Sequence, residues 1–146
     1  MWAALDRMGI NINYLLWIGL VMENHKLVLP EHLNHYGFLF GGNLLQWVDE
    51  YAWIAATLEY PAAKFVTIGL DRVEFRKNIR NGTILKFIIE RGRVGKTSVQ
   101  YGVLVFRGNG DECDNELLFS TNVTFVNVSS EGQKVALPEF VRRELD

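Results

Sequence analysis

The stretch GNLLQWVDEYAWIAATLE, residues 42–59, decides the fold of this chain. Its apolar residues recur at three- and four-residue spacing, the period of an α-helix: Leu44, Leu45, Val48, Ala52, Ala55 and Leu58. Trp47, Tyr51, Trp53 and Ile54 make the remaining surface apolar too. A helix that is apolar on nearly every side is buried on most sides. We therefore predict a central helix from Gly42 or Asn43 to Glu59, ended by Tyr60-Pro61.

After the helix the chain becomes rich in Val, Ile, Phe and Thr, which favours strands. The predicted strands are Lys64–Phe75, Thr83–Arg93, Thr97–Arg107 and Glu116–Val128. Asn81-Gly82, Val94-Gly95 and 108–110 supply the turns between them. These short connections predict an antiparallel meander of four strands.

The segments before and after this region are shorter. His25–Leu29 is predicted as a first strand that Pro30 stops, and Glu31–Phe40 as a loop. Pro138 favours a last helical piece at Glu139–Leu145. The order of strand, long helix and four strands predicts an α+β fold in which one antiparallel sheet wraps around one helix. The outer face of such a sheet still carries Val, Phe and Tyr, which favours pairing with a second copy of the chain.

Composition narrows the class of protein. A chain of 146 residues normally forms one domain, and a net charge of −2 does not suit a protein that coats nucleic acid. Residues 71–96 carry a local excess of Lys and Arg, which fits either an anionic ligand or a solvated sheet face. We expect 1–22 to be an N-terminal extension of uncertain role and 23–146 to be the functional domain. The apolar segment Ile10–Met22 is short for a membrane span, so a peripheral helix is favoured and no stable span is expected.

Cysteine and histidine usage argues against metal or thiol chemistry. Cys113 is the only cysteine, and it stands among Asp111, Glu112 and Asp114, which disfavour a thiolate. The histidines have no metal-ligand spacing with a carboxylate. We expect no metal, no cofactor and a reducing, cytoplasmic setting.

Gly41-Gly42 stands where the predicted helix begins. A helix start has backbone N–H groups without partners and partial positive charge. Without Cβ atoms, a ligand carbonyl can approach these amides and use them as an oxyanion hole. A tight turn that needs glycine explains the same pair.

Asp49 lies two turns into the apolar helix, where a carboxylate is costly unless it is paired or used. A polar stripe with Gln46, Glu50 and Thr57 facing water is the alternative. Seven residues separate Asp49 from Gly42, about 10 Å along a helix axis. We therefore hypothesise a dimer with antiparallel central helices, in which Asp49 of one chain approaches Gly41-Gly42 of the other. Asn34 in the preceding loop can donate to a carbonyl, accept from a water, or cap the loop.

With these residues in view, the chain resembles the acyl-CoA thioesterases of the hotdog superfamily. It carries the pattern N-x-x-G-x-x-[FH]-G-G-x-x-x-x-x-x-D in full, from Asn34 through Gly37, Phe40 and Gly41-Gly42 to Asp49. Other segments from residue 25 to 138 resemble the family too: Val66-Thr67, 71–75, Gly95-Lys96-Thr97-Ser98, 124–126 and 132–138. Asn81-Gly82 reverses the family's usual Gly-Asp, and 1–22 matches nothing in it.

The resemblance implies a hotdog fold and hydrolysis of acyl-CoA to free acid and coenzyme A. Asp49 would be general base or nucleophile, Asn34 would orient water or thioester, and amides at Gly41 and Gly42 would hold the oxyanion. The residues implied for binding coenzyme A and its acyl thioester are Thr67, Arg91, Arg93, Gly95, Lys96, Thr97 and Ser98. The family's assemblies are homodimers or trimers of dimers, and no metal is implied.

Two other functions fit the same fold. A hotdog dehydratase normally uses a histidine with a carboxylate near the helix, but His32 and His35 lie in the loop. A non-catalytic acyl-CoA-binding module is compatible with the fold, although the presence of Asn34 and Asp49 argues against it.

Overall fold

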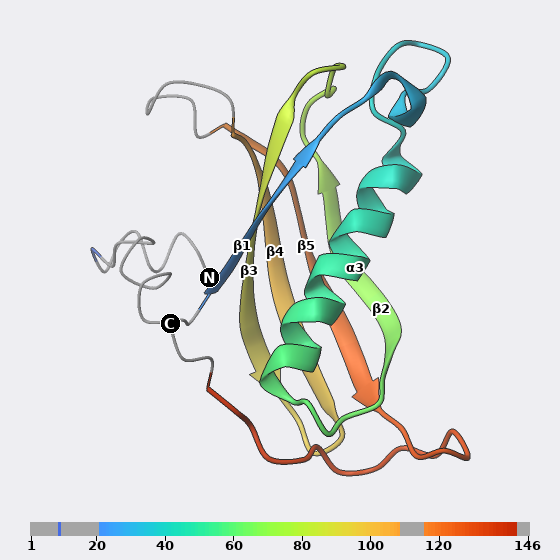
Figure 1. Ribbon diagram of the computed structural model, residues 1–146, viewed down its shortest axis with the longest axis vertical. Coiled ribbons are helices and arrows are strands. Elements are labelled where there is room, and N and C mark those ends of the chain that lie inside the picture. Colours follow the sequence, from blue (N-terminus) through green and yellow to red (C-terminus); the bar gives the residue numbers. More distant parts are fainter. Residues whose placement is uncertain (1–8, 10–20, 109–115, 143–146) are drawn as a thin grey trace.

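The computed structural model describes residues 9, 21–108 and 116–142, and there one long helix lies across one face of a five-stranded antiparallel sheet (Figure 1). This arrangement is the predicted hotdog fold. The strands are β1 (Val21–Leu27), β2 (Phe65–Phe75), β3 (Ile84–Val94), β4 (Ser98–Arg107) and β5 (Leu117–Asn127). The helix α3 (Gly41–Glu59) and the short 3₁₀ helix η1 (Pro30–His32) complete the elements.

The strand order corrects the predicted meander. The order is β1-β3-β4-β5-β2, so only β3, β4 and β5 follow one another through adjacent pairing. β2 pairs with β5 at one edge of the sheet, and β1 pairs with β3 at the other. The chain from β2 to β3 therefore crosses from one edge towards the other instead of turning back on itself. It passes the start of α3, where Leu39 donates its N–H to the carbonyl of Ile79 at 2.7 Å.

The core forms between α3 and the inner sheet face. Val99, Tyr101, Val103 and Val105 alternate along β4 and are fully buried, as their period of two predicts. From the helix, Val48, Ala52, Ala55 and Ala56 are equally buried against them. Small side chains along this face of α3 allow the helix to lie close to the sheet.

Two terminal predictions differ from the structure. The first strand begins at Val21 and ends at Leu27, earlier than predicted, and Leu29 precedes the 3₁₀ turn at Pro30. Within the predicted helix at Glu139–Leu145, the described residues 139–142 are not helical. Val141 donates its N–H to the Glu59 carbonyl at 2.8 Å, and the Phe140 ring packs on Tyr60, so tertiary contacts hold this segment extended. Cys113 and most of the expected peripheral helix at 10–22 lie outside the described residues; Val21 and Met22 of that segment lie in β1.

The turn from α3 into β2 is short and tightly bonded. Ala63 donates its N–H to Tyr60, and Lys64 donates to the side-chain oxygen of the buried Asn127 at 2.8 Å. The Lys64 carbonyl accepts from Val128 at 3.0 Å. These bonds fix where β2 starts relative to the end of the helix.

The outer edge of β2 has no partner strand in the described part of the chain. It nevertheless exposes large apolar side chains, among them Val66, Ile68 and Phe75, whose exposed fractions are 42%, 57% and 54%. Irregular register at Thr67/Gly69 and at Asp71/Glu74 bends the strand, and Arg72 adopts a left-handed φ of 50° at the second of these places. An unpaired strand edge flanked by exposed apolar groups is a surface that a second chain can cover.

Candidate active site

Asp49 lies on the face of α3 that looks towards β2. The Thr67 hydroxyl donates a 2.7 Å hydrogen bond to Oδ1 of Asp49, which leaves Oδ2 without a partner among the described residues. Asp49 is partly exposed, which is intermediate between the buried position and the water-facing stripe that the sequence left open. A carboxylate held by one hydroxyl and open on its other oxygen is able to bind and deprotonate a water.

Trp53 lies one helical turn after Asp49 on the same face. Its indole N–H donates to the carbonyl of Phe65 at 3.4 Å. Asp49 and Trp53, four residues apart on the helix, thus contact Thr67 and Phe65, two residues apart on β2. Four helical residues rise about 6 Å and two strand residues span about 6.6 Å. The spacing of the two contacts is therefore nearly the same on the helix and on the strand.

The start of α3 presents free amides, as predicted. Phe40 is the N-cap and has no capping side-chain bond, and its carbonyl accepts from Asn43 and Leu44. Within the described chain the N–H groups of Gly41 and Gly42 have no acceptor. A Cβ atom on Gly41 would lie 3.3 Å from the Phe75 ring, tighter than an ordinary contact, so a larger residue here would require the ring to shift. The arrangement supplies donors for a developing oxyanion.

Asn34 organises the loop that leads to these amides. Its Oδ1 accepts hydrogen bonds from the N–H groups of Tyr36 and Phe38 at 2.9 and 3.1 Å. The loop-capping role that the sequence left open is therefore present. Because the oxygen is occupied, the Nδ2 group is the end of the amide that remains for a ligand, and it can only donate.

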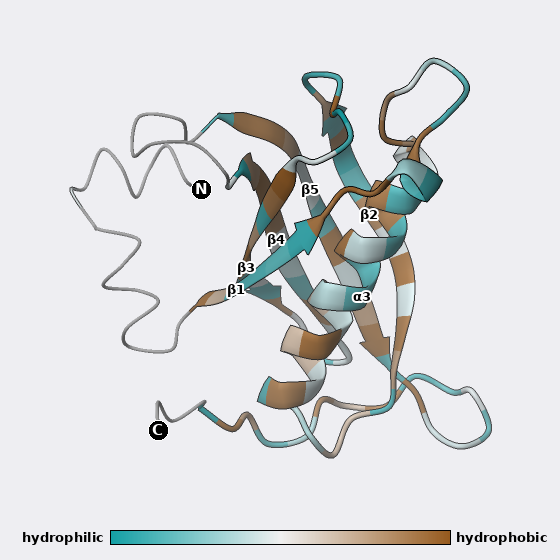
Figure 2. Ribbon diagram, turned by 45° about the horizontal axis from the view of Figure 1, so that its top comes forward, coloured by the Kyte–Doolittle hydropathy of each residue, from teal (hydrophilic) through white to brown (hydrophobic). Residues whose placement is uncertain are grey.

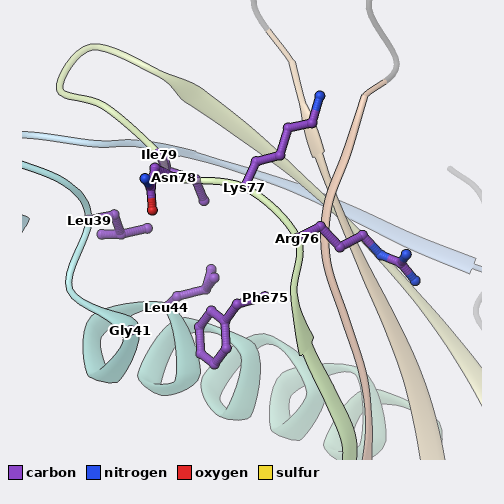
Figure 3. A pocket seen from close by; sticks show the side chains of 8 residues that line it. All are labelled: Leu39, Gly41, Leu44, Phe75, Arg76, Lys77, Asn78 and Ile79. Atoms are coloured by element: carbon purple, nitrogen blue, oxygen red, sulfur yellow. The ribbon is translucent and has the colours of Figure 1, made fainter.

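A cavity of about 390 Å³ opens beside the helix start (Figure 3). Leu39, Leu44, Phe75 and Ile79 supply its apolar lining. Arg76 and Lys77 belong to its rim, but both cations already have partners: Arg76 donates to Glu74 at 2.6 Å, and Lys77 donates to Glu116. The bond from Lys77 is the main reason that the pKa of Glu116 is lowered. In Figure 3 the side chains of both cations extend away from the helix start.

Apart from Thr67, the residues expected to bind coenzyme A lie at the other end of the helix. Gly95, Lys96, Thr97 and Ser98 form the turn between β3 and β4, which closes through a 2.8 Å bond from the Gly95 N–H to the Ser98 carbonyl. Figure 1 places this turn near the end of α3, far from Gly41 of the same chain. Arg93 and Lys96 are exposed there.

Arg91 has structural contacts. Its guanidinium lies 3.8 Å from the centre of the Phe140 ring and donates to the Tyr60 hydroxyl at 3.3 Å. Beneath it, the buried Tyr101 hydroxyl donates to Oε2 of the buried Glu59 at 2.5 Å. The cluster joins the extended tail to the end of the helix.

Histidine and metal chemistry have little support in the described residues. Nδ1 of His32 accepts from the Leu29 N–H at 3.0 Å, and its ring packs edge-on against Trp47. His35 packs on Tyr36 and is exposed. Over the described ranges no three His, Cys, Asp or Glu side chains come close enough to hold a metal ion. No helix in those ranges is both long enough and apolar enough to cross a membrane.

Sequence reasoning missed two features of this site. Thr67 was expected to contact substrate, whereas here its hydroxyl holds Asp49. Phe75 was not singled out, although its ring covers Gly41. No local pattern marks either contact, because β2 is brought to the helix only by the tertiary fold.

The comparisons with known proteins agree with this geometry. Residues 36–114 match the family model of the thioesterase superfamily, which is more than half of the chain. The chain is 30% identical over 116 residues to the uncharacterized acyl-CoA thioester hydrolase YkhA of Bacillus subtilis. That match covers 78% of this chain and 66% of YkhA, so the chain spans just under two thirds of that relative's length.

Solved structures show the same fold. The acyl-CoA hydrolase of Staphylococcus aureus, solved with butyryl coenzyme A, coenzyme A and coenzyme A disulfide, aligns with a TM-score of 0.72 and 29% identity, covering 83% of this chain and 73% of that one. Cj0915 of Campylobacter jejuni, a hexameric hotdog-fold thioesterase, aligns with a TM-score of 0.69 and 29% identity, covering 79% of this chain and 88% of that one.

The fold and the site together define a hotdog-fold protein with a helix-borne carboxylate and an open helix start. This chain belongs to the thioesterase superfamily.

Proposed function

We propose that this protein is an acyl-CoA thioesterase that hydrolyses acyl-CoA to a free acid and coenzyme A. The observation that carries the proposal is the Asp49 carboxylate, which Thr67 holds on one oxygen and leaves open on the other. The Staphylococcus aureus hydrolase has also been solved with a threonine, an asparagine or an aspartate replaced by alanine. These are the residue types of Thr67, Asn34 and Asp49. A cytoplasmic role in lipid metabolism fits a coenzyme A thioester as substrate.

The site requires two chains. Asp49 and the free amides of Gly41 and Gly42 are about 10 Å apart along one rigid helix, too far to act on one carbonyl. The exposed apolar edge of β2 lies beside Asp49 and favours a second copy that covers it. In a dimer with antiparallel α3 helices, each Asp49 faces the helix start of the partner subunit. Trimers of such dimers are the larger assembly that we propose, as in the hexameric Cj0915.

The chemistry then follows from the two halves. Amides at the helix start of one protomer, with the Nδ2 group of its Asn34, donate to the thioester oxygen and stabilise the oxyanion. Asp49 of the other protomer removes a proton from a water whose oxygen bonds to the carbonyl carbon. The carbon–sulfur bond breaks, and the thiolate of coenzyme A leaves and takes up the proton. Direct attack by the carboxylate, with hydrolysis of the resulting anhydride, uses the same placement.

Asp49 variants test the activity. Hydrolysis of a panel of acyl-CoAs is followed with a thiol reagent for wild type, Asp49→Asn and Asp49→Ala. We expect both variants to lose about 10²–10⁴-fold in kcat, the usual cost of losing a general base. Glu50→Gln, which changes the exposed neighbouring carboxylate, is the matched control and keeps its kcat. Unimpaired turnover in both Asp49 variants would remove this residue from the mechanism.

A mixture of two inactive chains tests whether the site is shared. Asn34→Ala and Asp49→Asn chains are co-expressed, and each combined site then draws its amide from one chain and its carboxylate from the other. Random pairing leaves about a quarter of the sites with both groups intact, so about a quarter of wild-type activity returns. A mixture no more active than its two components would show that each site is built from one chain.

A further inference from the structure

We propose that Trp53 is a specificity-determining residue that ends the acyl-binding space and restricts the enzyme to short acyl groups. This inference rests on the proposed thioesterase function and adds the substrate class.

Trp53 is held in place beside the carboxylate. Its exposed fraction is 43%, whereas Trp47, the other tryptophan of this helix, is only 7% exposed. The bond from its indole N–H to the Phe65 carbonyl ties it to β2. Asp49 is tied to the same strand two residues further on, through Thr67. The indole and the carboxylate are therefore fixed relative to each other by one helix and one strand.

The polarity of the helix face gives the direction of the acyl group. From Asp49 towards the helix start, this face carries the exposed Gly42 and Gln46 and the partly exposed Leu45. From Asp49 towards the helix end, it carries the exposed Trp53 ring and then the partly exposed Thr57. In Figure 2 the last turns of α3 carry the colour of hydrophobic residues, whereas the turns before them mix hydrophobic and hydrophilic residues. An apolar acyl chain favours the side of Trp53, and the polar arm of coenzyme A favours the other side.

The distance sets the length. Trp53 follows Asp49 by four residues, which is about 6 Å along the helix axis. With carbon–carbon bonds of about 1.5 Å, an acyl chain that starts at the carbonyl reaches the indole after about four or five bonds. The wild-type enzyme therefore takes acyl groups of about two to six carbons, and longer chains meet the ring.

Trp53→Ala tests the inference. Values of kcat and KM are measured for acetyl-, butyryl-, hexanoyl-, octanoyl- and decanoyl-CoA with wild type, Trp53→Ala and Trp53→Leu. We expect wild type to favour the short substrates and Trp53→Ala to gain on the long ones. The gain is about fourfold in relative kcat/KM for each methylene that enters the freed space, from about 0.8 kcal/mol per buried methylene. Trp53→Leu gives a smaller shift because it keeps part of the volume.

Leu58→Ala is the matched control. Leu58 is on the same helix with an exposed fraction of 53%, but it lies nine residues after Asp49, about two and a half turns, and faces the opposite side. Its removal leaves the chain-length profile unchanged. A profile that stays the same in whichever Trp53 variant folds and assembles overturns the inference, as does a wild type that prefers decanoyl-CoA. A wild type that hydrolyses none of the five substrates refutes the proposed function instead.

Discussion

Replacement of Tyr101 by Phe will weaken the junction between the helix end and the sheet. Tyr101 is fully buried in the core, and its hydroxyl donates a 2.5 Å hydrogen bond to the Glu59 carboxylate, which is only 3% exposed. The substitution keeps the ring and removes only this donor. Hydrogen bonds to charged groups contribute about 1.5–3 kcal/mol, so we expect the free energy of unfolding to fall by about 2 kcal/mol. For a chain of this length that corresponds to a Tm lower by about 6 °C.

The measurement is urea and thermal unfolding at a fixed protein concentration, because assembly also affects apparent stability. Tyr51→Phe is the matched control. Tyr51 packs edge-on against Phe87, and its hydroxyl has no hydrogen bond within the described chain. The control should change the unfolding midpoint little. Equal stability of Tyr101→Phe and Tyr51→Phe would show that the buried pair does not stabilise this junction.

Three further predictions concern pH, the support of Asp49 and one turn. Burial, and then the Glu59 carboxylate, raise the pKa of Tyr101. Above about pH 10 the Tyr101 hydroxyl ionises in the unfolded chain but not in the folded one, so the stability advantage of wild type over Tyr101→Phe shrinks as pH rises. Urea unfolding midpoints of both proteins from pH 8 to 11 measure this trend. Thr67→Ala removes the donor to Asp49 and should lower kcat about tenfold or more at unchanged fold, with recovery in Thr67→Ser; equal kcat in all three would refute the role of the hydroxyl. Gly82 has φ of 82°, so Gly82→Ala should cost about 1–2 kcal/mol in urea unfolding and Gly82→Asn less, and equal losses would contradict the backbone argument.

The helix and the strands were predictable because their patterns are local. The apolar period of residues 42–59 gave a helix that the structure begins one residue earlier, at Gly41. The alternation along β4 identified its buried face correctly. The strand order was not predictable in this way, because β2 and β3 are adjacent in sequence yet lie at different places in the sheet. The connection from β2 to β3 passes the start of α3 and crosses the sheet, and no turn residue in the sequence indicates this crossing.

The residues of the candidate site also fall into a local group, which was predictable, and a group brought together by tertiary packing, which was not. Asn34, Gly41, Gly42 and Asp49 come from one continuous segment, so their spacing could be read directly. Thr67 and Trp53 meet the site through contacts between α3 and β2 that depend on packing. The tail was misjudged for a similar reason, since Phe140 and Val141 bond to the end of the helix and hold the backbone extended.

The five-residue turn Tyr60–Lys64 has a consequence for how this chain can vary. The length of this turn determines which residues of β2 face α3, because side chains return to the same face about every four residues in a helix and every two residues in a strand. An inserted or deleted residue there that shifts β2 by one position would turn Thr67 to the opposite face of the strand, so the carboxylate would lose its support and the buried Phe65 would leave the core. Natural or engineered variants should therefore tolerate length changes at other surface turns far better than between residues 60 and 64.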